Sequence, residues 1–140
     1  MNQDYLVDQI RLVQDYLTRA RTISQHPRNE FLSEYLLSDA AIRELTVLFE
    51  TCHNIAKHLI AELGWRPPKS KAEAFEVLSE HHVIPTELCN AFREASRFRN
   101  LATYQTSVVD VSIVYEVLTK HLVDFEQFAV RVAEWIQKNA

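Results

Sequence analysis

Glycine is nearly absent from this sequence: Gly64 is the only one among 140 residues. The tight turns of β-hairpins draw on glycine and on Asn-Gly pairs, so a sheet protein of this length would need many more. Proline is also scarce, with four residues in total (Pro27, Pro67, Pro68 and Pro85). The shortage argues against sheet folds and predicts long helices joined by few loops.

Cysteine is almost as rare. Cys52 and Cys89 are the only two, and neither belongs to a CxxC pair. This pattern predicts free, buried thiols in a reducing compartment rather than a disulfide scaffold. The first residues show no basic region followed by an apolar stretch, and no apolar run approaches the ~20 residues that span a bilayer. We therefore expect a cytoplasmic protein with no membrane segment.

Positive charge is in deficit. Fifteen lysines and arginines stand against 19 acidic residues, a formal net charge of −4. The field of the whole chain does not attract polyanions, so a nucleic acid would need a local basic patch. One glycine cannot make a glycine-rich phosphate loop. His53 and His58 are five residues apart and would not share a helix face, which argues against a metal site. We expect neither a metal nor another cofactor.

Two long helices are predicted in the first half of the chain. An apolar stripe at steps of four and three predicts a helix from about Tyr5 to Ser24, ended by Pro27. A second helix is expected from about residues 28–31 to Gly64, a suitable C-terminal stop. Its ~35 residues would reach ~50 Å, longer than a compact domain needs. Part of it is expected to project or to pack against a second subunit. The first stripe consists of Leu6, Ile10, Val13, Leu17 and Ala20.

Three further helices are expected after the Pro67-Pro68 loop. Ser70 and Glu73 have capping-box spacing and predict a short helix that ends near residues 81–82. The next helix is expected from Pro85 to about residue 104. Asp110 is a good N-cap for a last helix that runs to the C-terminus. Residues 1–140 are thus predicted to form one all-α domain, an up-and-down bundle of four main helices plus a short one.

The densest group of side chains that could carry chemistry lies in the second half of the helix expected from Pro85 to about residue 104. Arg93, Arg97 and Arg99 fall within seven residues, and the first two share a helix face. One interpretation is a solvated face balanced by Glu87 and Glu94. The other is a phosphate-binding patch, because guanidinium groups bind phosphate in a bidentate way. Composition does not decide between them.

Several separated segments between Leu36 and the C-terminus together form a recognisable pattern. Glu50, Asn54 and His58 follow one another at steps of four residues. Residues 66–78 form a stretch with two prolines, and Val83-Ile84-Pro85 and Phe98-Arg99-Asn100 come after it. These segments resemble the HepT-like branch of the HEPN superfamily, in which the second helix carries a glutamate, an aspartate four residues on and a histidine four beyond, and the later segments follow in this order.

The nuclease motif departs from the family pattern at two positions. In the family it is Arg-Asn, three residues, His, one residue and Tyr, with an aspartate four positions later. Here Arg99 and Asn100 are present and Asp110 keeps the register. Tyr104 stands where the histidine should be, and Thr106 stands where the second tyrosine should be.

The resemblance implies a helical homodimer that acts as a metal-independent RNA endonuclease and toxin. It also implies a partner, a minimal nucleotidyltransferase antitoxin that modifies the motif tyrosine with AMP. The sequence does not decide whether Tyr104 or Thr106 would take that AMP. The site predicted from the resemblance and the arginine patch has catalytic positions Arg99, Asn100, Tyr104 and Glu50, and RNA-binding positions Arg93, Arg97 and Arg99.

The tyrosine bears directly on the expected activity. A histidine has a pKa near 6.5 and suits proton transfer at neutral pH, whereas a tyrosine has a pKa near 10 and is a poor base. General acid–base catalysis is typically worth ~10²–10⁴-fold, so RNA cleavage is expected to be weakened or lost. The alternatives are a non-catalytic dimeric binding partner, or a substrate-binding subunit of a nucleotidyltransferase with a small-molecule target.

Overall fold

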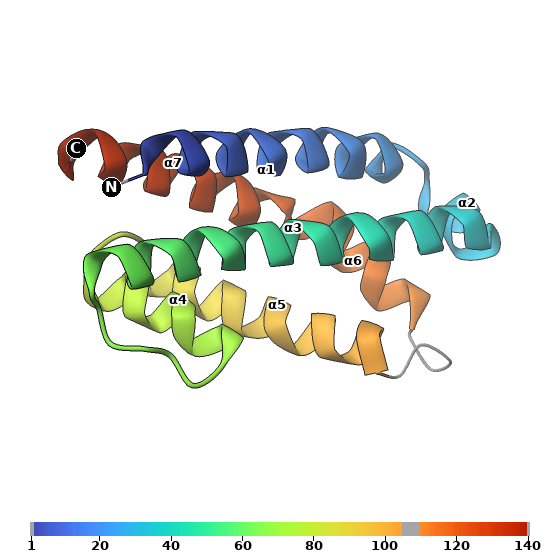
Figure 1. Cartoon of the computed structure of the whole chain (residues 1–140). Coiled ribbons are helices and arrows are strands. Elements are labelled where there is room, and N and C mark those ends of the chain that lie inside the picture. Colours follow the sequence, from blue (N-terminus) through green and yellow to red (C-terminus); the bar gives the residue numbers. More distant parts are fainter. Residues whose placement is uncertain (1, 105–109, 140) are drawn as a thin grey trace.

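All regular structure in the described part of the chain, residues 2–104 and 110–139, is helical (Figure 1). This is a computed structural model, and side-chain positions are described for residues 2–98 and 110–139. The prediction of an all-α bundle is confirmed. None of the helices in these ranges is both long and apolar enough to cross a membrane. The helices are α1 (Gln3–Ser24), α2 (Arg28–Ser33), α3 (Tyr35–Leu63), α4 (Lys71–Glu80), α5 (Thr86–Tyr104), α6 (Val111–Lys120) and α7 (Leu122–Asn139).

The first helix packs as its periodicity predicts. Four of its five stripe residues are buried, and Ile10 is half-buried. Its buried face meets α3 and α7, so α1 covers one side of the bundle (Figure 1). The helix begins at Gln3, slightly before the expected start, because the Asn2 side chain accepts a hydrogen bond from the Tyr5 N–H at 3.2 Å.

The predicted second helix is two helices. Glu34 has an extended backbone (φ −114°, ψ 102°), which separates α2 from α3. Its Oε1 accepts from the Leu36 N–H at 3.1 Å and so caps α3. The break resets the phase of the helix, and Leu36 is 63% exposed just after it. The predicted stop is correct: Gly64 is left-handed (φ 67°), and its N–H donates to the Ile60 carbonyl.

The predicted last helix is also divided. Asp110 caps its first part as expected, since Oδ1 accepts from the Ser112 N–H at 2.9 Å. The hydroxyl of Ser112 also donates to this carboxylate, and the two bonds lower the pKa of Asp110. His121 (φ −116°, ψ 1°) then leaves the helical conformation and separates α6 from α7. The apolar faces of α6 and α7 therefore do not form one continuous stripe.

A cluster of phenylalanines fixes the position of α5. Phe92 of α5 stacks on Phe75 of α4, with ring centroids 4.3 Å apart and planes at 20°. It also meets Phe125 and Phe128 of α7 at 5.5 and 5.1 Å, while Phe49 of α3 lies 5.7 Å from Phe75. A fully buried phenylalanine contributes about 1.5–3 kcal/mol relative to exposure. The helix with the arginines is thus anchored in the core.

Candidate functional site

The candidate site is built on α5, which carries the arginine-rich segment. The carbonyl of Pro85 accepts from the N–H groups of Leu88 and Cys89, both at 3.1 Å, and starts the helix. Leu88, Cys89 and Phe92 are buried, so Arg93 and Arg97 are left on the outer surface. Three predicted catalytic residues, Arg99, Asn100 and Tyr104, belong to the last turns of α5. Their side chains, and Thr106, lie outside the described part of the chain.

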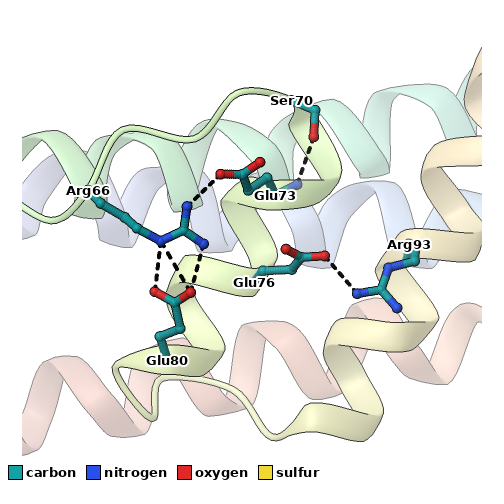
Figure 2. Close-up of polar contacts among 6 residues, drawn as sticks. All are labelled: Arg66, Ser70, Glu73, Glu76, Glu80 and Arg93. Atoms are coloured by element: carbon teal, nitrogen blue, oxygen red, sulfur yellow. Dashed lines mark hydrogen bonds and ion pairs between the residues drawn. The ribbon is translucent and has the colours of Figure 1, made fainter.

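Arg93 is bound to a carboxylate of the neighbouring helix. Its Nη2 donates to Glu76 Oε1 of α4 at 2.7 Å, and its Nη1 donates to Asn90 Oδ1 at 3.3 Å. Figure 2 shows the two side chains reaching toward each other from α4 and α5. The hydrogen bond to Glu76 raises the pKa of Arg93. A phosphate that approached Nη2 of Arg93 would compete with this carboxylate for the guanidinium.

Arg97 is paired on its own helix. Its Nη1 donates to Glu94 Oε1 at 2.9 Å, and both side chains are 69% exposed. Glu94 was expected to balance this face, whereas the partner of Arg93 is Glu76 rather than Glu87. Although Arg93 and Arg97 start from one face of α5, their charged ends go to different carboxylates. The structure therefore does not bring these two guanidinium groups to a common point.

The loop between α3 and α4 is held by Arg66. Arg66 Nε and Nη2 donate to the two oxygens of Glu80 at 3.0 and 2.7 Å, and Nη1 donates to Glu73 at 2.5 Å (Figure 2). The bond from Arg66 lowers the pKa of Glu80. Ser70 caps the helix as predicted, because its Oγ accepts from the Glu73 N–H at 3.1 Å. These bonds fasten the Pro67-Pro68 loop to the outside of α4.

Glu50, the remaining predicted catalytic residue, also contacts α4. Its two carboxylate oxygens accept from Lys71 Nζ at 2.8 and 3.0 Å, and both side chains are about one-third exposed. Lys71 is the first residue of α4, and Glu76 on the same helix binds Arg93. The short helix α4 thus connects two of the predicted site residues, one on α3 and one on α5. Sequence reasoning did not predict this bridging role.

A groove of about 790 Å³ lies on the other flank of α5, between that helix and α6 and the start of α7. Its apolar residues include Phe49 and Leu45 of α3, Phe98 of α5, Ile113 and Val117 of α6, and Phe125 of α7. We call it the α5–α6 groove. Ile113 of α6 is 50% exposed at this groove.

The histidines do not gather into a metal site. His53 lies 6.4 Å from the Phe75 ring of α4, whereas His58 stacks on Tyr5 of α1 at 4.4 Å. The two therefore lie on different faces of α3, as their spacing predicts. In the described residues, no group of three or more His, Cys, Asp or Glu side chains is arranged to hold a metal ion.

Comparison with known proteins identifies the family. The family model described as ribonuclease HepT-like matches residues 13–132. The mRNA nuclease HepT of Shewanella oneidensis is 26% identical over 125 residues, which is 89% of this chain and 93% of that protein. The match includes the whole of α5 with the arginine-rich segment.

Solved structures of other proteins have the same helical fold as this chain. A tri-AMPylated HEPN toxin of Shewanella oneidensis, solved in complex with its MNT antitoxin, is 25% identical with a TM-score of 0.88 over 96% of this chain and 99% of that one. A cytosolic Bacillus subtilis protein of unknown function, 14% identical, has a TM-score of 0.85 over 99% of this chain and 93% of that one, which speaks for the fold alone. The match over residues 13–132 settles the family, and the chain belongs to the ribonuclease HepT-like family.

Proposed function

We propose that this chain is the HEPN toxin component of a toxin–antitoxin pair and that a minimal nucleotidyltransferase is its antitoxin. The observation that carries the proposal is the family match across α1 to α7, which includes the segment with Arg99 and Asn100. The Shewanella oneidensis relative is an mRNA nuclease, and the similar toxin is solved in complex with an MNT antitoxin. The target of the activity is RNA, and the active form is a homodimer.

We further propose that RNA cleavage by this chain is slow. Metal-independent cleavage needs a group that takes the proton from the attacking ribose hydroxyl, and Tyr104 stands at the position of the motif histidine. A tyrosine at neutral pH is almost wholly protonated, so it serves poorly as that base. Arg99 and Asn100 keep the capacity to hold the phosphate by hydrogen bonds. The expected loss is on the order of 10²–10⁴-fold relative to a histidine-bearing motif.

One structural observation favours a second candidate, a non-catalytic binding subunit of the pair. Arg93 and Arg97, two of the three predicted RNA-binding arginines, are already paired with Glu76 and Glu94. An arginine that donates to a carboxylate of its own chain attracts phosphate less strongly than a free one. In this version the chain retains the dimer and the nucleotidyltransferase interface and does not cleave RNA.

An RNA cleavage assay separates these candidates. Purified wild type is compared with Tyr104→His, Arg99→Ala and, as a matched arginine control, Arg11→Ala on α1. A weakened nuclease cleaves slowly, loses this cleavage in Arg99→Ala, keeps it in Arg11→Ala and gains at least tenfold in Tyr104→His. A binding subunit shows no cleavage in the wild type. Wild-type cleavage that Tyr104→His does not accelerate would overturn the assigned role of Tyr104.

The AMP acceptor and the oligomer are tested on the same preparation. In the proposed pair, a hydroxyl of this chain attacks the α-phosphorus of ATP, pyrophosphate leaves, and the hydroxyl proton passes to solvent. Tyr104 and Thr106 occupy the histidine and second-tyrosine positions of the motif, and both carry a hydroxyl. Mass spectrometry after incubation with the nucleotidyltransferase and ATP identifies the acceptor, and Tyr104→Phe and Thr106→Val show which one is used. Light scattering after size exclusion measures the subunit number.

A further inference from the structure

Arg28 lies beside α6, although the sequence gave no reason to connect it with the nuclease motif. It is the exposed first residue of α2, and its guanidinium carbon is 5.9 Å from the centre of the Tyr115 ring of α6. The Tyr115 ring is itself fixed, because its hydroxyl donates to the His26 carbonyl at 3.3 Å and its centre is 5.1 Å from that of the Phe31 ring. The contact with Tyr115 therefore holds Arg28 against α6.

The nuclease motif lies toward the same end of the bundle. The helix α5 ends at Tyr104, and Asp110 caps α6, so only residues 105–110 connect the motif helix with α6. Figure 1 shows α2, the start of α6 and the end of α5 toward one end of the molecule. The hydrogen bonds from Ser112 are the main cause of the lowered pKa of Asp110, and the nearby charge of Arg28 adds a smaller part. The guanidinium is thus close to the segment that follows the motif.

Arg28 differs from the paired arginines of α5 in having no carboxylate partner. Within residues 2–98 and 110–139, no acidic side chain accepts a hydrogen bond from its guanidinium. The neighbouring carboxylates have other donors, since Asp110 is bonded within its own helix cap and Glu30 lies 2.9 Å from His26 Nδ1. A guanidinium over an aromatic ring uses its flat face, so the N–H groups along its edge stay available to a ligand.

We propose that Arg28 binds a phosphate group of the RNA backbone beside the nuclease motif. This inference rests on the function proposed above, in which RNA is the substrate. A guanidinium donates two parallel hydrogen bonds to one phosphate, and such a contact positions the strand without taking part in proton transfer. Arg28 supplies an unpaired positive charge for this purpose, whereas the charges of Arg93 and Arg97 are paired within the chain.

The test measures RNA affinity apart from RNA cleavage. The probe is a fluorescein-labelled single-stranded RNA with 2′-O-methyl groups, which cannot be cleaved because it lacks the attacking hydroxyl. Arg28→Met keeps an apolar stem and removes the charge, while Arg28→Lys keeps the charge and loses the paired hydrogen bonds. Arg19→Met on α1 is the matched control, because Arg19 is also exposed and lies over a tyrosine, 5.5 Å from the centre of the Tyr16 ring.

Fluorescence anisotropy of the probe is measured at several salt concentrations. Arg28→Met is expected to bind about three- to tenfold more weakly than the wild type, and Arg28→Lys to lie between the two. Loss of one phosphate contact on a single strand should also lower the slope of log affinity against log salt concentration by ~0.7. Arg19→Met is expected to match the wild type in both quantities. In the cleavage assay, Arg28→Met should raise KM more than it lowers kcat, because the contact holds substrate and transition state alike.

The proposal is wrong if Arg28→Met binds the probe like the wild type, if its salt slope is unchanged, if Arg19→Met loses as much affinity, or if the wild type does not bind the probe. ATP carries the same chemical group. If Arg28→Met binds RNA normally but slows AMP transfer by the nucleotidyltransferase, the bound phosphate is that of ATP and the assignment to RNA fails. If the wild type binds the probe but cleaves no RNA, the proposed ribonuclease activity is wrong, whereas a loss of affinity in Arg28→Met still supports this phosphate site.

Discussion

The two flanks of α5 differ in how completely other side chains of this chain pack against them and pair with their polar groups. On the α4 flank, Phe92 stacks on Phe75 and Arg93 bonds to Glu76, so apolar and polar groups both have partners within the chain. On the α6 flank, the α5–α6 groove leaves Ile113 half exposed beside Phe98. Monomeric proteins rarely expose a contiguous apolar surface without a use for it. The first flank is filled by side chains of the chain itself, whereas the second presents an open groove.

The largest effect is expected where the two flanks join. Phe92 is 1% exposed and touches rings of α3, α4 and α7, so Phe92→Ala removes support from both. The free energy of unfolding is expected to fall by about 3–5 kcal/mol, measured by chemical denaturation. Phe92→Leu, which refills much of the volume, is the control and should cost clearly less. A loss below about 1 kcal/mol for Phe92→Ala would mean that the aromatic cluster does not organise the core.

Loss of a helix cap should weaken the α4 flank alone. In Ser70→Ala, the Glu73 N–H loses the hydroxyl that accepts its hydrogen bond at 3.1 Å. The expected cost is about 1 kcal/mol of unfolding free energy. Ser70→Thr keeps an acceptor and should remain near the wild type. Equal losses in the two variants would assign the effect to something other than the cap.

The pair between Glu50 and Lys71 tests whether α4 is fastened to α3 by charge. A double-mutant cycle with Glu50→Gln and Lys71→Met should give a coupling energy of about 0.5–1 kcal/mol, because both side chains are only about one-third exposed. The same cycle at Arg11 and Asp8, which are both 71% exposed, supplies the reference and should give a smaller value. Equal coupling energies for the two pairs would mean that the ion pair between Glu50 and Lys71 does not fasten α4 to α3.

The pH dependence of stability should show the Arg66–Glu80 contact. The hydrogen bond from Arg66 holds the pKa of Glu80 below its ordinary range, so the stabilisation is full above the unfolded pKa of about 4.3. It is lost as the pH falls through the lower folded value. The stability difference between wild type and Glu80→Gln should therefore shrink below about pH 4 in thermal unfolding. Glu134→Gln should show no such convergence, and a constant difference for Glu80→Gln would contradict the bond.

The smallest effect is expected on the groove flank. Ile113 is 50% exposed, so Ile113→Ser should change the free energy of unfolding by no more than about 0.5 kcal/mol. A large loss of stability would show that Ile113 supports the fold and that the two flanks are not different in kind.

Sequence reasoning predicted the helices whose signals are local. The stripe from Leu6 to Ala20, the Ser70 cap and the Gly64 stop all depend on residues within a few positions of one another, and all are confirmed. The breaks at Glu34 and His121 were missed, because neither position has a glycine or proline to signal it. Apolar periodicity continues across both and imitates one long helix.

The site was less accessible to sequence reasoning, because its contacts are between helices. Arg93 meets Glu76, 17 residues earlier, and Lys71 meets Glu50, 21 residues earlier. No spacing rule within one helix gives such pairs. The groove depends on the angle between α6 and α7, which the sequence does not indicate. The exposure of Ile113 was therefore not predictable from its position in the sequence. The family resemblance was correct, while the roles of Arg99, Asn100 and Tyr104 stay predictions.

Burial of both native cysteines makes the molecule a convenient background for site-directed labelling. Cys52 is fully buried and Cys89 is 5% exposed, and burial raises the pKa of both thiols, so neither is a ready nucleophile at neutral pH. A single cysteine introduced at Glu116 or at Glu134 would therefore react with a maleimide dye ahead of either. Pairs of such dyes would report distances across an assembled complex without removal of the native thiols.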